Sequence, residues 1–251
     1  MDKIRYFFRG TPDGYVFPVG SVEHWLIIAI ILLGIELITR HRYKLRDPKY
    51  TKEFKIAMII MLSLQQIVLY LWYGFSGYFS IQESLPLYNC RVAIILTIFA
   101  FITNKDFFKN ICCYWGIVGA ILALAFPVVD PFQFPHYTMV SFFGGHILML
   151  WSAIYFLVVE KHYINKRSLV SILLFTNIYH VLIYVFDKIT NSNYCYLVNP
   201  PFSIGFIDRL SQFFYTATAI NVFNVTIFLF YYVCKVIYNH YSEKGKIESL
   251  I

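Results

Sequence analysis

The chain has 251 residues, of which 59% are hydrophobic and 14% charged, and its formal net charge is +7. A soluble domain is roughly half apolar and about a quarter charged, so this composition excludes an ordinary soluble protein and favours one embedded in a membrane.

Seven apolar blocks follow one another along the chain, each close to the roughly 20 residues that cross a bilayer as a helix. Ser84 and Pro86 are typical of the cap and first turn of a helix, so we expect the third block to begin there. The sequence predicts an all-α, polytopic bundle of about seven transmembrane helices, forming a single transmembrane domain over residues 1–251. In chain order the blocks are 22–39, 54–73, 85–101, 111–128, 139–159, 168–186 and 213–238.

Basic residues gather in alternate loops. The loops 74–84 and 129–138 contain no Lys or Arg. By the positive-inside rule, this alternation predicts an outer N-terminus and a cytoplasmic C-terminus, which an odd number of spans allows. We therefore expect a multi-pass protein of the cell (plasma) membrane whose charge serves topology and not a nucleic-acid partner. The basic residues of the expected cytoplasmic loops and tail are Arg40, Arg42, Lys44, Arg46, Lys49, Lys52, Lys105, Lys109, Lys161, Lys166, Arg167, Lys235, Lys244 and Lys246.

Polar residues interrupt several blocks at a similar depth. With a rise of about 1.5 Å per residue, they lie roughly 8–14 Å from the expected outer ends of their helices. Polar side chains at such a depth normally face the bundle interior or a wet cavity, which makes this layer a candidate site. Hydrogen bonding between helices, without any catalysis, is the alternative. The layer comprises Gln65, Gln66, Cys90, Arg91, His146, Asn177, His180 and Asn221.

The layer contains the groups of a cysteine acyl-transfer centre. A thiol is a useful nucleophile only as a thiolate, which needs a nearby base or positive charge. Cys90 would attack, His146 or His180 would take its proton, and Arg91 would supply charge. Asn89 or a glutamine would donate to the oxyanion. In a bilayer, the acyl donor that arrives without a carrier is a phospholipid ester, and this chemistry requires no cofactor and no metal.

Four short motifs give the chain a family resemblance. LPLYNC (85–90) resembles the LPLHLC-type motif of the YwaF-like integral membrane proteins, and SVEHW (21–25) is similar to their Ser-x-x-His. FFGGHILML (142–150) and NSNYCYLVNPP (191–201) are similar to two further motifs of that family, in the same order. YwaF-like proteins are similar to a eukaryotic membrane acyltransferase that makes polyunsaturated ether phospholipids through a cysteine centre. They are more distantly similar to the androgen-induced membrane hydrolases of fatty-acid esters.

The resemblance implies that Cys90 is the nucleophile, His146 the base, and a phospholipid or lyso-phospholipid the substrate. The family histidine of LPLHLC is Tyr88 here, so His24 or His180 would have to assist instead. Asn193 and Tyr194 lie in the outer segment 187–208, which would fold over the pocket as a lid or line the entrance for the acyl acceptor. An ordinary interfacial loop is the alternative.

Four alternatives stay open. With water as the acceptor, the same site is a lipid esterase. A binding or transport protein for a small molecule, with no covalent step, would also suit seven helices and a polar layer. A disulfide between Cys90 and Cys195 would remove the nucleophile. A metal site built from Cys90, His146 and His180 is weaker, because no HxxxH spacing supports it.

Overall fold

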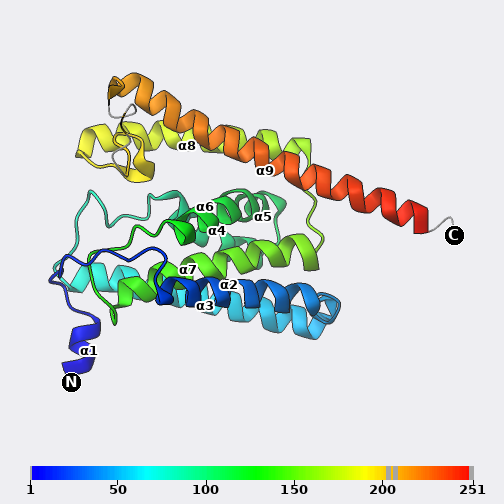
Figure 1. Cartoon of the computed structure of the whole chain (residues 1–251), viewed down its shortest axis with the longest axis horizontal. Coiled ribbons are helices and arrows are strands. Elements are labelled where there is room, and N and C mark those ends of the chain that lie inside the picture. Colours follow the sequence, from blue (N-terminus) through cyan, green and yellow to red (C-terminus); the bar gives the residue numbers. More distant parts are fainter. Residues whose placement is uncertain (1, 202–204, 206–208, 249–251) are drawn as a thin grey trace. The chain divides into compact units, whose positions relative to one another are not determined.

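The computed structural model describes residues 2–201, 205 and 209–248, and their regular structure is entirely helical (Figure 1). The chain divides into two compact units, Met1–His162 and Tyr163–Ile251, which are described separately. Within the described residues, six helices are long and apolar enough to span a membrane, and a seventh, of 15 residues, is apolar but shorter. Each predicted block overlaps one of these helices. The all-α, multi-pass architecture is therefore confirmed, whereas orientation and the single-domain organisation stay predictions.

The first unit is a helix bundle built around α7 (Tyr137–Ile154). This helix contacts α2 (Val22–Arg40), α3 (Pro48–Phe75), α4 (Asn89–Thr103) and α6 (Ile117–Ala125). Small residues along α7, including Ser141, Gly145 and Ala153, are buried and allow neighbouring helices to approach closely. The short elements of this unit are α1 (Asp2–Phe7), η1 (Lys44–Arg46), α5 (Asp106–Ile111) and the π-helical segments η2 (Cys112–Gly116) and η3 (Tyr155–Val159).

The third apolar block begins later than expected. Placing its cap at Ser84 and its first turn at Pro86 is wrong, because α4 begins at Asn89 after the N-cap Tyr88. Ser84 closes a turn instead: its Oγ accepts a hydrogen bond from the Ser80 N–H at 2.9 Å. Its own N–H donates to the Ser80 carbonyl at 2.8 Å. Cys90 is consequently the second residue of the helix, not one that lies deep within it.

The second unit pairs α8 (Lys166–Thr190) with α9 (Gln212–Glu248), and the short helix η4 (Tyr194–Tyr196) lies in their connection. Asn177 and Asn224 form a reciprocal amide pair across α8 and α9, at 2.9 and 3.0 Å. Such a pair satisfies two polar side chains that would otherwise face hydrocarbon.

Candidate functional site

Cys90 lies in the first turn of α4, where backbone N–H groups have no partner within the helix. The positive end of the helix dipole stabilises a thiolate at such a position. The backbone N–H of Arg91 and the imidazole of His146 both interact with the Cys90 sulfur. Cys90 is half-buried and forms no disulfide, so the structure lends no support to a bond with Cys195.

His146 comes from α7 and is 4% exposed. Its Nδ1 lies 2.6 Å from the carbonyl oxygen of Phe142. A carbonyl can only accept, so Nδ1 carries the proton and the neutral ring has its lone pair on Nε2. Nε2 is buried and makes no hydrogen bond of ordinary geometry. It is therefore the nitrogen that can accept a proton from the neighbouring Cys90 thiol.

A cavity of about 50 Å³ joins these two residues. Its walls come from α3, α4 and α7 and from the loop before α7. Cysteine, histidine, amide, hydroxyl and carboxyl side chains thus share a space that is otherwise enclosed by apolar residues. The lining residues are Gln65, Gln66, Leu69, Cys90, Arg91, Ile94, Asp130, Thr138, Ser141, Phe142 and His146.

Arg91 fastens the start of α4 to the rest of the first unit. Its Nη1 donates to the carbonyls of Glu83 and Leu85 at 3.0 and 3.2 Å. Its Nη2 donates to the Tyr73 hydroxyl at 2.7 Å, and the guanidinium lies over the Tyr73 and Tyr88 rings. The guanidinium holds the turn that precedes Cys90 and also places a positive charge at the cavity.

An amide chain forms one wall of the cavity. The Gln65 Nε2 donates to the carbonyl and the hydroxyl of Ser141 at 3.1 and 2.5 Å. The Gln66 Nε2 donates to the Gln65 Oε1 at 2.7 Å. Gln66 is 6% exposed, and its Oε1 has no hydrogen-bond partner among the described residues.

Asp130 contributes a carboxyl group from the loop between α6 and α7. Burial raises the pKa of this group, while the nearby charge of Arg91 opposes the increase. The cavity lining therefore includes an acidic group and a basic group as well as Cys90. Within the described chain, no three His, Cys, Asp or Glu side chains are grouped to hold a metal ion.

Comparison with known protein families matches residues 19–234 to the TMEM164 family. The chain belongs to the TMEM164 family. The matched range includes α3, α4, α7, α8 and the first part of α9, so it covers the cavity and most of the second unit. Comparisons with curated proteins and with solved structures gave no significant match. Membership establishes a membrane protein, and the narrower resemblance to YwaF-like proteins stays a prediction.

Among the predicted site residues of this TMEM164-family protein, the structure brings Cys90, Arg91, His146 and Gln66 together at the cavity. His24 is not among the lining residues. Its Nδ1 accepts the Gly20 N–H at 2.9 Å, and its Nε2 contacts the Leu124 carbonyl at 2.8 Å. Nδ1 therefore holds the turn before α2, and Nε2 joins α2 to α6. Asn89 begins α4 and does not line the cavity.

The other predicted site residues belong to the second unit. His180 is fully buried on α8 beside the ring of Phe223. The Asn221 amide donates to the Ala217 carbonyl of its own helix at 2.9 Å. Asn177 is engaged with Asn224, a partner that the sequence reasoning missed. A role for these residues in substrate binding stays a prediction.

The NSNYCYLVNPP segment has a structural role in the second unit. The Asn193 Oδ1 accepts the N–H groups of Val198 and Asn199, each at 3.0 Å. The Tyr194 N–H donates to the Asp187 Oδ1 at 3.0 Å, and Tyr194 is fully buried. Both residues fold the connection onto α8. Residues 202–204 and 206–208 of the predicted entrance segment lie outside the described residues.

Four cavity residues were missed as site residues: Gln65, Asp130, Thr138 and Ser141. Gln65 was expected in the polar layer but was not assigned to the site. Thr138, Ser141 and His146 follow the spacing of one helix face, which was a usable signal. Asp130 lies in a loop, and no periodic pattern in the sequence points to it.

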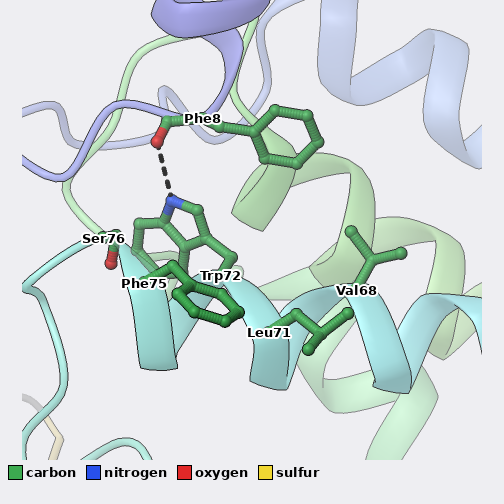
Figure 2. A pocket seen from close by; sticks show the side chains of 6 residues that line it. All are labelled: Phe8, Val68, Leu71, Trp72, Phe75 and Ser76. Atoms are coloured by element: carbon green, nitrogen blue, oxygen red, sulfur yellow. Dashed lines mark hydrogen bonds between the residues drawn. The ribbon is translucent and has the colours of Figure 1, made fainter.

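A second, larger hollow of about 240 Å³ lies near the end of α3 (Figure 2). There the Trp72 Nε1 donates to the Phe8 carbonyl at 3.1 Å, which ties the N-terminal segment to α3. The lining is apolar except for Ser76 and holds no group suited to nucleophilic or acid–base chemistry. It is lined by Phe8, Val68, Leu71, Trp72, Phe75 and Ser76.

Proposed function

We propose that this TMEM164-family protein is a phospholipid acyltransferase or transacylase of the plasma membrane that works through an acyl thioester on Cys90. The observation that carries the proposal is the pairing of Cys90, in the first turn of α4, with a histidine whose Nδ1 is held by the Phe142 carbonyl. Nucleophile, base and a group that orients the base are the three parts of a covalent catalytic centre.

The first half-reaction follows from these parts. His146 Nε2 takes the thiol proton, and the sulfur attacks the ester carbonyl of a phospholipid. A C–S bond forms and the C–O bond to glycerol breaks. His146 returns its proton to the leaving oxygen, which releases a lyso-phospholipid. The first-turn N–H groups of α4 lie beside the sulfur, where they can stabilise the oxyanion.

The acceptor in the second half-reaction distinguishes the candidate activities. A lyso-phospholipid hydroxyl makes the protein a transacylase, whereas water makes it a lipid esterase. The topology expected from the loops places the site in the outer leaflet. A non-covalent binding or transport protein is the competing proposal, and the embedded polar cavity supports it equally well.

Intact-protein mass spectrometry after incubation with a defined phospholipid tests the covalent step. A hydroxylamine-labile acyl mass on the natural protein, absent from Cys90→Ser, is the expected result. Cys112→Ala is the matched control, because Cys112 is fully buried in η2 and outside the cavity. Lipid turnover that persists unchanged in Cys90→Ala would rule the mechanism out. Substrate uptake that survives Cys90→Ala but is lost when another cavity residue is changed, as in Gln65→Leu, would favour transport.

A further inference from the structure

The cavity beside Cys90 has an apolar floor, and Ile94 is its central residue. Ile94 follows Cys90 by four positions on α4, so the two side chains share one face of the helix with about 5–6 Å between their Cβ atoms. A helical side chain leans toward the N-terminus of its helix, so Ile94 leans toward the turn that carries Cys90. Ile94 is 3% exposed and lines the cavity. It therefore bounds the space next to the sulfur.

Contacts from α3 and α7 close the floor around Ile94. A methyl group on Gly145 would lie 3.0 Å from the Ile94 Cδ1 atom and 3.2 and 3.3 Å from the Nε2 and Cδ atoms of Gln65. Ile94 and Gln65 therefore reach the same point on α7, next to His146, whose imidazole interacts with the Cys90 sulfur. Carbon atoms pack best at about 3.5–4.0 Å, so no space for another methyl group remains between Ile94 and α7.

The volume of the cavity limits what the acyl group can place there. The cavity measures about 50 Å³. An apolar cavity of roughly 150 Å³ holds a benzene molecule, so this one has room for about two carbon-sized groups. On acylated Cys90, the carbonyl oxygen and the carbon next to the carbonyl, C2, fill that room, and the rest of the chain lies outside the cavity. A branch on C2 would require space for a third group beside the sulfur.

We infer that Ile94 is a specificity-determining residue that restricts Cys90 to acyl groups without a branch at C2. A methyl branch would have to displace the Ile94 Cδ1 atom, which Gly145 and Gln65 hold in place. One additional methyl group in a pocket of fixed shape changes a rate by roughly 10-fold to 200-fold. This inference rests on the proposed function and names its acyl class, the straight chain. The bonds made and broken stay those of the first half-reaction: C–S forms and C–O breaks.

The experiment offers the protein an equimolar mixture of two phosphatidylcholines, one with hexadecanoyl and one with 2-methylhexadecanoyl chains. Mass spectrometry of the protein and of the released acyl products gives the ratio in which the two chains have reacted. This ratio does not depend on the fraction of a variant that is folded. We expect the natural protein to favour the straight chain by about tenfold or more.

Ile94→Val removes only the Cδ1 atom and so vacates the space that one methyl branch requires. It should raise the proportion of the branched chain about tenfold. Ile95→Val is the matched control, because it makes the same deletion on α4 at a residue that does not line the cavity, and it should leave the ratio unchanged. Ile94→Ala removes two further carbons and should raise the proportion of the branched chain again.

Ratios in Ile94→Val and Ile94→Ala that equal the ratio in Ile95→Val would overturn the inference. Equal reaction of the two chains in the natural protein would overturn it as well. Both results leave the proposed function standing, because Cys90 is still acylated. If the natural protein carries neither acyl group on Cys90 and releases no acyl product, the proposed function fails and this inference fails with it, so the two failures are distinguishable.

Discussion

At the scale of single residues, Arg91 holds the start of α4 in place through hydrogen bonds and also supplies a positive charge. Its guanidinium bonds two loop carbonyls and the Tyr73 hydroxyl. A lysine keeps the positive charge but cannot reproduce this planar, multidentate arrangement. Arg91 therefore positions the start of α4, and with it the sulfur of Cys90, through hydrogen bonds that no other cation can replace.

We expect Arg91→Lys to lower the free energy of unfolding by about 1–3 kcal/mol, because at least one buried acceptor loses its donor. Thermal unfolding in detergent measures this loss. Tyr73→Phe removes only the hydroxyl and should cost less. The double variant should lose less than the sum of the two single variants, since both break the same hydrogen bond. Strict additivity would show that the bond contributes nothing.

At the scale of elements, two adjacent glycines on α7 have opposite surroundings. A methyl group on Gly145 would lie 3.0 Å from the Ile94 side chain and 3.2 Å from the Gln65 Nε2. A methyl group on Gly144 would meet no atom within 4 Å. The cavity wall that Gln65 and Gln66 form therefore depends on the absence of a side chain at Gly145. Gly144, where a methyl group meets no atom, provides an internal control.

We expect Gly145→Ala to displace Gln65 from Ser141, destabilise the protein by about 1 kcal/mol and slow release of the acyl group from Cys90. Gly144→Ala should be neutral or stabilising by up to about 1 kcal/mol, because alanine favours the helix. Thermal unfolding and acyl release, measured on both variants, check the pair. Equal effects of the two substitutions would mean that contact with Gln65 is unimportant.

The start of α7 has a titratable cap. The Nε2 of His136 contacts the Arg9 carbonyl at 2.9 Å, so this nitrogen carries the proton and Nδ1 accepts the Thr138 N–H at 3.2 Å. Burial lowers the pKa of His136, and burial likewise lowers the pKa of His162. The neutral ring is thus the form that caps the helix.

A lowered histidine pKa makes folding pH-dependent in a definite direction. The unfolded chain takes up a proton near pH 6.5, whereas the folded chain resists it. Stability is therefore full above about pH 6.5 and falls as the pH drops toward the folded pKa. Unfolding temperatures measured from neutral to about pH 5 should show this slope. His136→Asn, which keeps a capping acceptor but does not titrate, should reduce it. His162 contributes to the slope that remains.

The apolar runs were long enough to predict every major helix, but their ends depend on local hydrogen bonds. α3 begins at Pro48, before the predicted Phe54, because Asp47 accepts the Lys49 N–H and Pro48 occupies the first turn. That cap was readable in the sequence. The Ser84 turn was not, since serine and proline suit a helix start and a loop equally well.

The same limit applies to the candidate site. Cys90, His146 and Gln66, which the sequence grouped by their depth, line one cavity, although Cys90 is the second residue of its helix and not deep within it. Depth could not show that His24 faces a backbone carbonyl or that Asp130 reaches the cavity from a loop. Rotation about the helix axis and the course of loops depend on packing between distant segments. A single sequence carries that information only weakly.

At the scale of the whole molecule, exposed apolar side chains surround both units. On α2, Leu26 and Leu33 are each 59% exposed, and on α8, Leu174 and Leu182 are also largely exposed. Patches of this extent on a soluble monomer would cause association. In a bilayer they are the lipid-facing surface, while backbone groups are satisfied within the helices. The fold thus agrees with the TMEM164 family's place among membrane proteins.

The leaflet that the cavity serves depends on orientation, which the charges predict. The turn before Cys90 follows loop 74–84, which has no Lys or Arg. Residues 40–52, from the end of α2 to the start of α3, carry six. In sealed right-side-out vesicles, added protease should therefore remove an N-terminal tag and spare a C-terminal one. Replacing Arg40, Arg42, Lys44 and Arg46 with glutamine should weaken this preference. Cleavage of the C-terminal tag alone would place Cys90 at the cytoplasmic leaflet, and the acyl donor would then come from the inner lipids.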